Sequence, residues 1–150
     1  MKSHRTPLVT AARLIQGGLF LLFGLNGFFN FLPQPPPPAA AANFAGALFA
    51  TGYMIPLIKG TEIAPALLLL SNRFVPLALA IIAPVIVNIV AFHAFLAPAG
   101  LALPLLLLAT ELVLAFGYRD AFAPMLKARV TPTAASSRTH VTTRPADATA

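Results

Sequence analysis

The chain has 150 residues, of which 58% are hydrophobic and only 9% are charged, and its formal net charge is +6. A water-soluble domain carries about a quarter charged residues, so the solvent of this chain is predicted to be lipid. The sequence contains no cysteine. This excludes disulfides, thiolate metal sites, iron–sulfur ligation and thiol redox relays within the chain.

The basic residues flank apolar stretches and form no groove with interleaved aromatic residues. The sequence pI near 10.9 therefore does not indicate nucleic-acid binding. Two of the three histidines, His4 and His140, lie in polar tails, so the chain alone does not offer two axial ligands for a haem inside a bundle. No metal, haem or iron–sulfur cofactor is expected.

The chain divides into a membrane domain over residues 1–127 and a tail over residues 128–150. The membrane domain contains four apolar spans, each near the ~20 residues that a helix needs to cross a bilayer. Each span must be helical because lipid offers the backbone no hydrogen-bond partner. The spans cover residues 10–32, 53–70, 74–96 and 101–121. The fold class is therefore predicted as an all-α polytopic membrane four-helix bundle.

A further short helix is predicted between the first and second spans. Residues 33–38 are nearly all proline, which favours a stiff polyproline II segment. The apolar run over residues 39–50 is too short to cross a bilayer, so it is predicted as an interfacial or re-entrant helix. Pro65 and Pro84 fall inside the second and third spans, where each should kink its helix or free a carbonyl group.

The tail over residues 128–150 is rich in Thr, Ala, Ser and Pro and has no apolar periodicity. It is predicted to be disordered and cytoplasmic. Nine of the ten Lys and Arg residues fall on one side of the predicted spans, and the tenth is Lys59. The positive-inside rule then places both termini in the cytoplasm. The first span is predicted to be retained, since it is longer than the roughly 7–15 apolar residues of a signal peptide.

All four spans carry polar side chains. With a rise of about 1.5 Å per residue, these residues fall in the outer half of the membrane, close to its midplane. An ionised side chain inside hydrocarbon costs roughly 2.5–3.5 kcal/mol on insertion scales, so their convergence predicts a functional site. The set consists of Asn26, Lys59, Glu62, Asn88, His93 and Glu111.

The charges of this set are unequal, because two carboxylates, Glu62 and Glu111, face one ammonium, Lys59. If Lys59 pairs with one carboxylate, the other must be protonated, or be matched by a protonated His93 or by Arg13. Such groups suit proton uptake and release, which makes Lys59, Glu62 and Glu111 the candidate catalytic residues.

The same charged residues also have purely structural interpretations. Lys59 and Glu62 stand three residues apart, and an intrahelical ion pair between them would make insertion into the membrane tolerable. Glu111 would lock helix packing if it accepted a hydrogen bond from Asn26 or Tyr118.

The remaining polar and small residues are open to two interpretations as well. Asn88 is compatible with bonding a carbonyl freed by Pro84, and His93 with a place at the polar interface. Gly24 and Gly27 share one face of the first span. This face permits either close helix approach or a ligand lying against the backbone.

Several different short motifs lie along the membrane domain, over residues 23–29 (FGLNGFF), 51–53 (TGY), 56–62 (PLIKGTE), 72–78 (NRFVPLA), 83–88 (APVIVN), 92–93 (FH) and 118–120 (YRD). Together they resemble the DoxX/DoxD-like family of small four-helix membrane proteins, over about residues 8–127. The resemblance implies a multi-pass protein of the bacterial cytoplasmic (inner) membrane. Some relatives are subunits of a thiosulfate:quinone oxidoreductase, and others associate with sulfur or oxidative-stress enzymes.

The leading functional hypothesis is the quinone-facing subunit of a membrane oxidoreductase, because a chain without cysteine holds no sulfur on a thiol. A quinone needs donors to its oxygens, a proton acceptor and flat apolar walls. Lys59 would stabilise a reduced carbonyl oxygen, while Glu62 and Glu111 would move protons. The expected cofactor-binding residues, which orient the ring, are Asn26, Asn88 and His93.

Two other functions are compatible with the sequence. The first is a non-enzymatic scaffold that anchors soluble partners through Arg73, Arg119 and Asp120 and through the basic tail. The second and weaker one is a small-solute or proton carrier, for which four helices suffice only in an oligomer. The expected partners are the lipid bilayer, a quinone, proteins of a redox complex and further copies of this chain.

Overall fold

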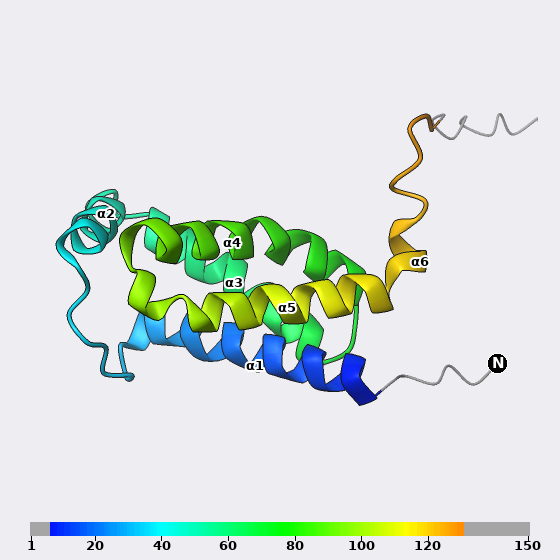
Figure 1. The fold of residues 1–150 in the computed structure, drawn as a ribbon, viewed down its shortest axis with the longest axis horizontal. Helices are drawn as coiled ribbons and strands as arrows, with labels where there is room; N and C mark the ends of the chain where they lie inside the picture. The colour runs from blue at the N-terminus through cyan, green and yellow to red at the C-terminus, as the bar shows by residue number, and fades with distance from the viewer. Residues whose placement is uncertain (1–6, 131–150) are drawn as a thin grey trace, which may run out of the picture.

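The computed structural model describes residues 7–130, and every regular element in this part of the chain is helical (Figure 1). The predicted all-α class is therefore confirmed for these residues. The predicted disordered tail lies outside the described residues except for positions 128–130. The elements are α1 (Pro7–Phe29), α2 (Ala39–Ala50), α3 (Met54–Leu70), α4 (Val75–Leu96), the 3-10 turn η1 (Pro98–Gly100), α5 (Ala102–Gly117) and α6 (Arg119–Phe122).

Helices α1, α3, α4 and α5 run side by side along the molecule, and α2 lies across one end of them (Figure 1). Helix α1 packs against α3 and α5, and α4 packs against the same two helices. All of these helices contribute side chains to the hydrophobic core. The beginning of α1 and the short helix α6 are both at the end opposite α2 (Figure 1).

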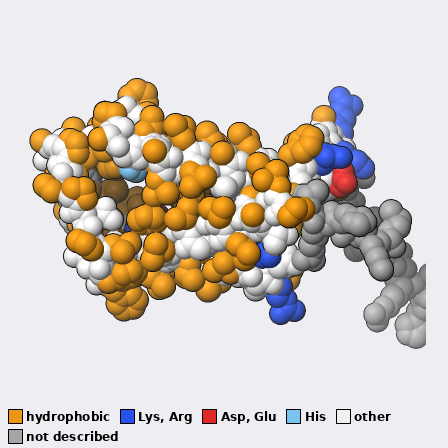
Figure 2. Space-filling view, turned by 60° about the horizontal axis from the view of Figure 1, so that its bottom comes forward, with side chains coloured by type: hydrophobic (Ala, Val, Ile, Leu, Met, Phe, Trp, Pro, Cys, Tyr) orange, Lys and Arg blue, Asp and Glu red, His pale blue; other side chains and the backbone are white. Residues whose placement is uncertain are grey.

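The length and composition of the helices suit a membrane. Helices α1 and α4 are each long and apolar enough to cross one, and α2 with α3 would make a third span if the bent pair is counted together. Helix α5, with 16 residues, is a shorter apolar helix. Apolar side chains cover most of the visible face, and Lys and Arg gather at one end (Figure 2). The described chain is consistent with an all-α membrane protein.

The short helix expected after the first span is present as α2. It is turned by 96° from α3 at the break between Ala50 and Met54. Gly52 adopts a positive φ of 74° in this break, a conformation that glycine reaches without steric cost. The two helices therefore meet at nearly a right angle and do not form one straight span.

The connection between α3 and α4 closes on backbone hydrogen bonds. Asn72 has a positive φ of 56°. The Arg73 N–H donates to the Leu68 carbonyl at 3.0 Å, and the Asn72 N–H donates to the Leu69 carbonyl at 3.1 Å. This is a Schellman-type helix end, in which asparagine takes the left-handed position usually held by glycine. It explains how α3 reverses into α4 within a few residues.

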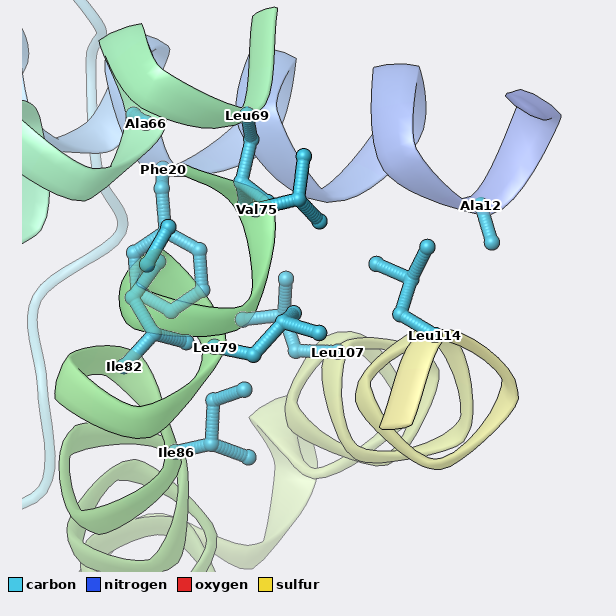
Figure 3. Close-up of a cluster of buried hydrophobic side chains, with 11 residues drawn as sticks. Ala12, Phe20, Ala66, Leu69, Val75, Leu79, Ile82, Ile86, Leu107 and Leu114 are labelled. Carbon is cyan, nitrogen blue, oxygen red and sulfur yellow. The ribbon is translucent and has the colours of Figure 1, made fainter. Parts of the chain in front are cut away.

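The hydrophobic core fills the half of the bundle nearer the basic end. Figure 3 shows side chains from all four long helices meeting there, among them Phe20, Leu69, Ile82 and Leu114. Ile82 and Leu114 have no exposed surface. Towards α2 this packed core gives way to polar side chains and cavities, and the candidate site lies at that end.

Candidate functional site

Two adjoining cavities lie in the half of the molecule nearer α2. The first, here called the bundle cavity, has a volume of about 580 Å³ and lies between α1, α3, α4 and α5. The second, here called the groove, has a volume of about 500 Å³ and lies between α2, α3 and α4. Lys59, Glu62 and His93 line both of them. The space-filling view shows a hollow at this end, opposite the basic cluster, with a histidine visible in it (Figure 2).

The centre of the site is an ion pair within α3. Lys59 Nζ donates to both carboxylate oxygens of Glu62, at 3.0 Å to Oε1 and 2.8 Å to Oε2. Glu62 is 4% exposed, and the side chain of Lys59 is 23% exposed. The predicted intrahelical pair therefore exists, and it faces the cavities. Two of the three donors of an ammonium group are used by Glu62, which leaves one for another acceptor.

The stem of Lys59 is held against α1. A Cβ atom added at Gly27 would meet Lys59 Cδ at 2.5 Å, and one added at Gly24 would meet Ile63 Cγ1 at 2.6 Å. The two glycines therefore serve the close approach of α1 and α3, the first of the two interpretations offered by the sequence. Gly27 also lines the bundle cavity, so the backbone of α1 forms part of its wall.

His93 stands near the end of α4 with one ring nitrogen engaged. Its Nδ1 lies 2.9 Å from the Ile89 carbonyl oxygen. Since a carbonyl oxygen only accepts, Nδ1 carries the hydrogen and Nε2 presents a lone pair in the neutral ring. The ring packs edge-on against Phe92, with 5.2 Å between the ring centres. The ring centres of Phe92 and of Phe44 of α2 are 5.8 Å apart. An aromatic cluster thus holds an acceptor at the boundary of the two cavities.

Asn26 has a structural role and also lines the bundle cavity. Its Oδ1 accepts a hydrogen bond from the Leu32 N–H at 2.7 Å, and its own carbonyl accepts one from the Asn30 N–H at 2.8 Å. These bonds fasten the chain where α1 ends. The side-chain NH₂ group is then the part of Asn26 that remains to donate to a ligand.

Asn88 lies on the groove side only. It is exposed and lines the groove but not the bundle cavity. Among residues 7–130 its side chain makes no hydrogen bond, so a bond to the carbonyl freed by Pro84 does not form. Pro84 itself is accommodated inside α4, and Pro65 inside α3.

Glu111 is separated from the other predicted residues. Its Oε2 accepts a hydrogen bond from Gln16 Nε2 of α1, so neither Asn26 nor Tyr118 is its partner. Glu111 lines neither cavity. Leu107, one helical turn before it on α5, does line the bundle cavity. The structure therefore gathers five of the six predicted residues around the two cavities and leaves Glu111 deeper in the bundle.

Gln16 was missed by the sequence interpretation. It is fully buried, with 0% exposure, although it is an amide within an apolar span. That position is itself a signal, because an amide inside hydrocarbon must find its hydrogen-bond partner on another helix.

Arg13 does not neutralise Glu111. Its Nη1 donates to the carbonyl oxygen of Leu69, and to that of Leu70 at 3.3 Å. These are the last carbonyl groups of α3, which carry the negative end of the helix dipole. In the described range the ion pairs are Lys59–Glu62 and the exposed contact of Arg119 with Asp120 at 3.8 Å.

The arrangement can bind a small molecule that has an apolar body and oxygen atoms able both to accept and to donate hydrogen bonds. Within residues 7–130 no three His, Asp or Glu side chains are grouped so as to hold a metal ion. Comparison of the chain with family models, with curated proteins and with solved structures gives no match.

Proposed function

We propose that this protein is a four-span membrane protein that binds the ring of a quinone in the bundle cavity, as the quinone-facing subunit of a membrane oxidoreductase system. The observation that carries the proposal is that the Lys59–Glu62 pair and His93 line one largely apolar cavity. Its volume, about 580 Å³, falls in the usual range for small-molecule sites, roughly 300–1,000 Å³. The resemblance to the DoxX/DoxD-like family supports the same assignment.

The four spans of this proposal are α1, α3, α4 and α5. Helices α3 and α5 have 17 and 16 residues, so they reach about 24–26 Å at 1.5 Å per residue. This is shorter than the ~30 Å hydrocarbon core, and the bilayer would thin locally around them. The basic end faces the cytoplasm of a bacterial inner membrane by the positive-inside rule. The bundle cavity then lies in the outer half.

The chemistry follows from the donors and acceptors around the cavity. Lys59 would donate its third N–H to a carbonyl oxygen of the quinone, and the NH₂ of Asn26 would be a second donor. Nε2 of His93 would accept a hydrogen bond from a hydroxyl group of the quinol, whose formation from the quinone takes two electrons and two protons. Glu62 is the carboxylate that exchanges protons with the ring. The electrons come from a protein partner in the same redox system, which is linked to sulfur oxidation or to oxidative stress.

The proposal changes the roles expected from the sequence. Glu111 lines neither cavity, so it is not assigned to the quinone ring. Asn88 lines only the groove, where it would contact the part of a ligand that extends between α2 and α4. The ring itself is assigned to Lys59, Glu62 and His93.

The test is quinone binding by purified protein in detergent or nanodiscs. Ubiquinone and menaquinone are titrated against wild type, Lys59→Met and Glu62→Gln, with Lys127→Met as a control at an exposed position outside both cavities. Binding by wild type and by the control, weakened at least tenfold in both cavity variants, is expected. Equal binding by all four proteins, or no binding by wild type, would reject the site.

A non-enzymatic scaffold is the second candidate. It is favoured by the exposed end of the molecule, where Arg119 lies 4.9 Å from the centre of the Phe116 ring and where Met125 and Leu126 are largely exposed. Crosslinking in native membranes distinguishes the two functions. A stable soluble partner that is lost when residues 128–150 are removed, from a protein that binds no quinone, would favour the scaffold.

A further inference from the structure

Gln16 of α1 and Glu111 of α5 form a polar contact inside the hydrophobic core. They are 0% and 7% exposed, and Gln16 Nε2 donates to Glu111 Oε2. Core residues flank the contact about one turn away on both helices, at Ala12, Phe20, Leu107 and Leu114. These neighbours are apolar, and Phe20 and Leu107 among them also line the bundle cavity, whereas Gln16 and Glu111 line neither cavity.

The other end of the Gln16 amide has no partner. In the part of the chain that the structure describes, Gln16 Oε1 is the one buried side-chain polar atom without a hydrogen bond. A buried acceptor left in this state is destabilising, and buried polar groups almost always find a donor. A water that donated to Gln16 Oε1 would still leave the charge of Glu111 uncompensated. The missing component is therefore a hydrogen-bond donor.

The charge of Glu111 is also uncompensated. Lys59 of α3 is bound to Glu62, and Arg13 of α1 is bound to the terminal carbonyl groups of α3. His93 of α4 lines the cavities and is bonded to its own helix. No cation on any packed helix pairs with Glu111 in the described structure. An ionised carboxylate here would be a buried, unpaired charge, which is strongly unfavourable.

We infer that Glu111 carries a proton in the resting protein and that its hydroxyl group donates to Gln16 Oε1. The carboxylic acid and the amide then form a cyclic pair with two hydrogen bonds, from amide to acid and from acid to amide. One proton supplies the missing donor and removes the unpaired charge. The same conclusion holds if the oxygen and nitrogen of the Gln16 amide exchange places. A protonated Glu111 would then donate to the amide oxygen, whereas an ionised Glu111 would bring two acceptors together with no hydrogen between them.

This pair is a proton-binding site between α1 and α5, independent of whether the bundle cavity binds a quinone. Arg13 lies three residues before Gln16, on the same face of α1. When Glu111 releases its proton, Arg13 is the cation on that face which can compensate the new charge. To do so it must leave the carbonyl groups of Leu69 and Leu70.

The chain offers a clean test because it contains only two glutamates, Glu62 and Glu111. Protein labelled with ¹³C at the glutamate side-chain carboxyl carbon, reconstituted in lipid at neutral pH, gives two carboxyl signals in infrared and solid-state NMR spectra. We expect one signal of an ionised carboxylate and one of a protonated acid. Glu111→Gln should remove the acid signal, and Glu62→Gln should leave it in place.

The Gln16→Leu variant reports on the partner. It should retain a protonated acid at Glu111 but shift its C=O frequency upward, since the hydrogen bonds to the amide are lost. If Glu111→Gln fails to accumulate, the single signal left in Glu62→Gln still identifies the state of Glu111. Two ionised signals in the wild type, or an acid signal that belongs to Glu62, would overturn the inference. So would loss of the acid signal on adding sodium at constant pH, which would indicate a metal cation in place of the proton.

Discussion

Lys59 of α3 lies directly over the backbone of Gly27 of α1, so closely that a Cβ atom at position 27 would meet three carbons of the lysine stem at 2.5–2.7 Å. The lysine therefore reaches Glu62 along a path that exists only because α1 has no side chain there. A packing feature of one helix thus sets the position of the ammonium on another.

Gly27→Ala is expected to displace Lys59 and to weaken quinone binding. The added methyl group meets the middle of the lysine stem, so Lys59 or α1 must shift, and overpacking of this kind costs about 1–3 kcal/mol. Gly18→Ala is the matched control, because a Cβ at Gly18 meets nothing within 4 Å. Thermal unfolding in detergent and quinone titration measure both variants. An equally small effect of the two substitutions would contradict the proposed role of Gly27.

The Lys59–Glu62 pair is expected to behave as a unit. Removing one partner leaves a buried charge uncompensated, and such single changes cost about 3–5 kcal/mol, whereas replacing both partners by apolar residues is often neutral. Lys59→Met and Glu62→Leu should each destabilise the protein, and the double variant should recover most of the loss. Unfolding free energies from a double-mutant cycle check this. Additive losses would show that the two side chains do not depend on each other.

Arg13 is expected to anchor the end of α3 to α1. A charged donor bound to carbonyl oxygens contributes about 1.5–3 kcal/mol, so Arg13→Gln should lower stability by an amount of that order. Amide hydrogen exchange should rise specifically at Leu68 to Arg73, the segment that closes α3. Arg129→Gln, an exposed position in the described chain, is the control and should leave exchange there unchanged. Protection of this segment in Arg13→Gln would contradict the anchoring role.

The Gln16–Glu111 contact is expected to tolerate joint replacement better than single replacement. Gln16→Leu deprives the acid of its partner, and Glu111→Leu leaves the whole amide without one, so each should cost about 1–3 kcal/mol. The Gln16→Leu, Glu111→Leu double variant places apolar groups on both helices and should be close to wild type in stability. Chemical or thermal unfolding of the four proteins measures the coupling. A double variant as unstable as the sum of the singles would indicate independent roles.

The helical elements and the break between α2 and α3 were predictable from local patterns. The five prolines among residues 33–38 exclude a helix there, and the run over residues 39–50 is apolar but short, so a separate helix such as α2 follows from chain chemistry alone. The Lys59–Glu62 pair was also predictable, since residues three apart on one helix face each other whatever surrounds them. These predictions depend on neighbours in the chain.

The partners of Glu111 and Arg13 were not predictable in the same way. Rise per residue estimates the depth of a side chain in the membrane but not the direction in which it leaves its helix. Glu111 and Glu62 fall at similar predicted depths, yet Glu111 turns to Gln16 and Glu62 turns to Lys59 and the cavities. The rotation of each helix about its own axis depends on which faces pack together.

Composition alone determined that this chain is apolar, because nine charges in every hundred residues are too few to cover a surface in water. Its helices follow, because lipid offers no hydrogen-bond partner to backbone N–H and C=O groups, which must then bond within the segment. The tertiary structure alone decided which buried polar groups of different helices meet. Close contacts at glycines bring α1 against α3, and core packing sets the rotation of α5 about its axis. These contacts between distant parts of the chain explain why Glu62 faces a cavity while Glu111 is enclosed with the amide of Gln16.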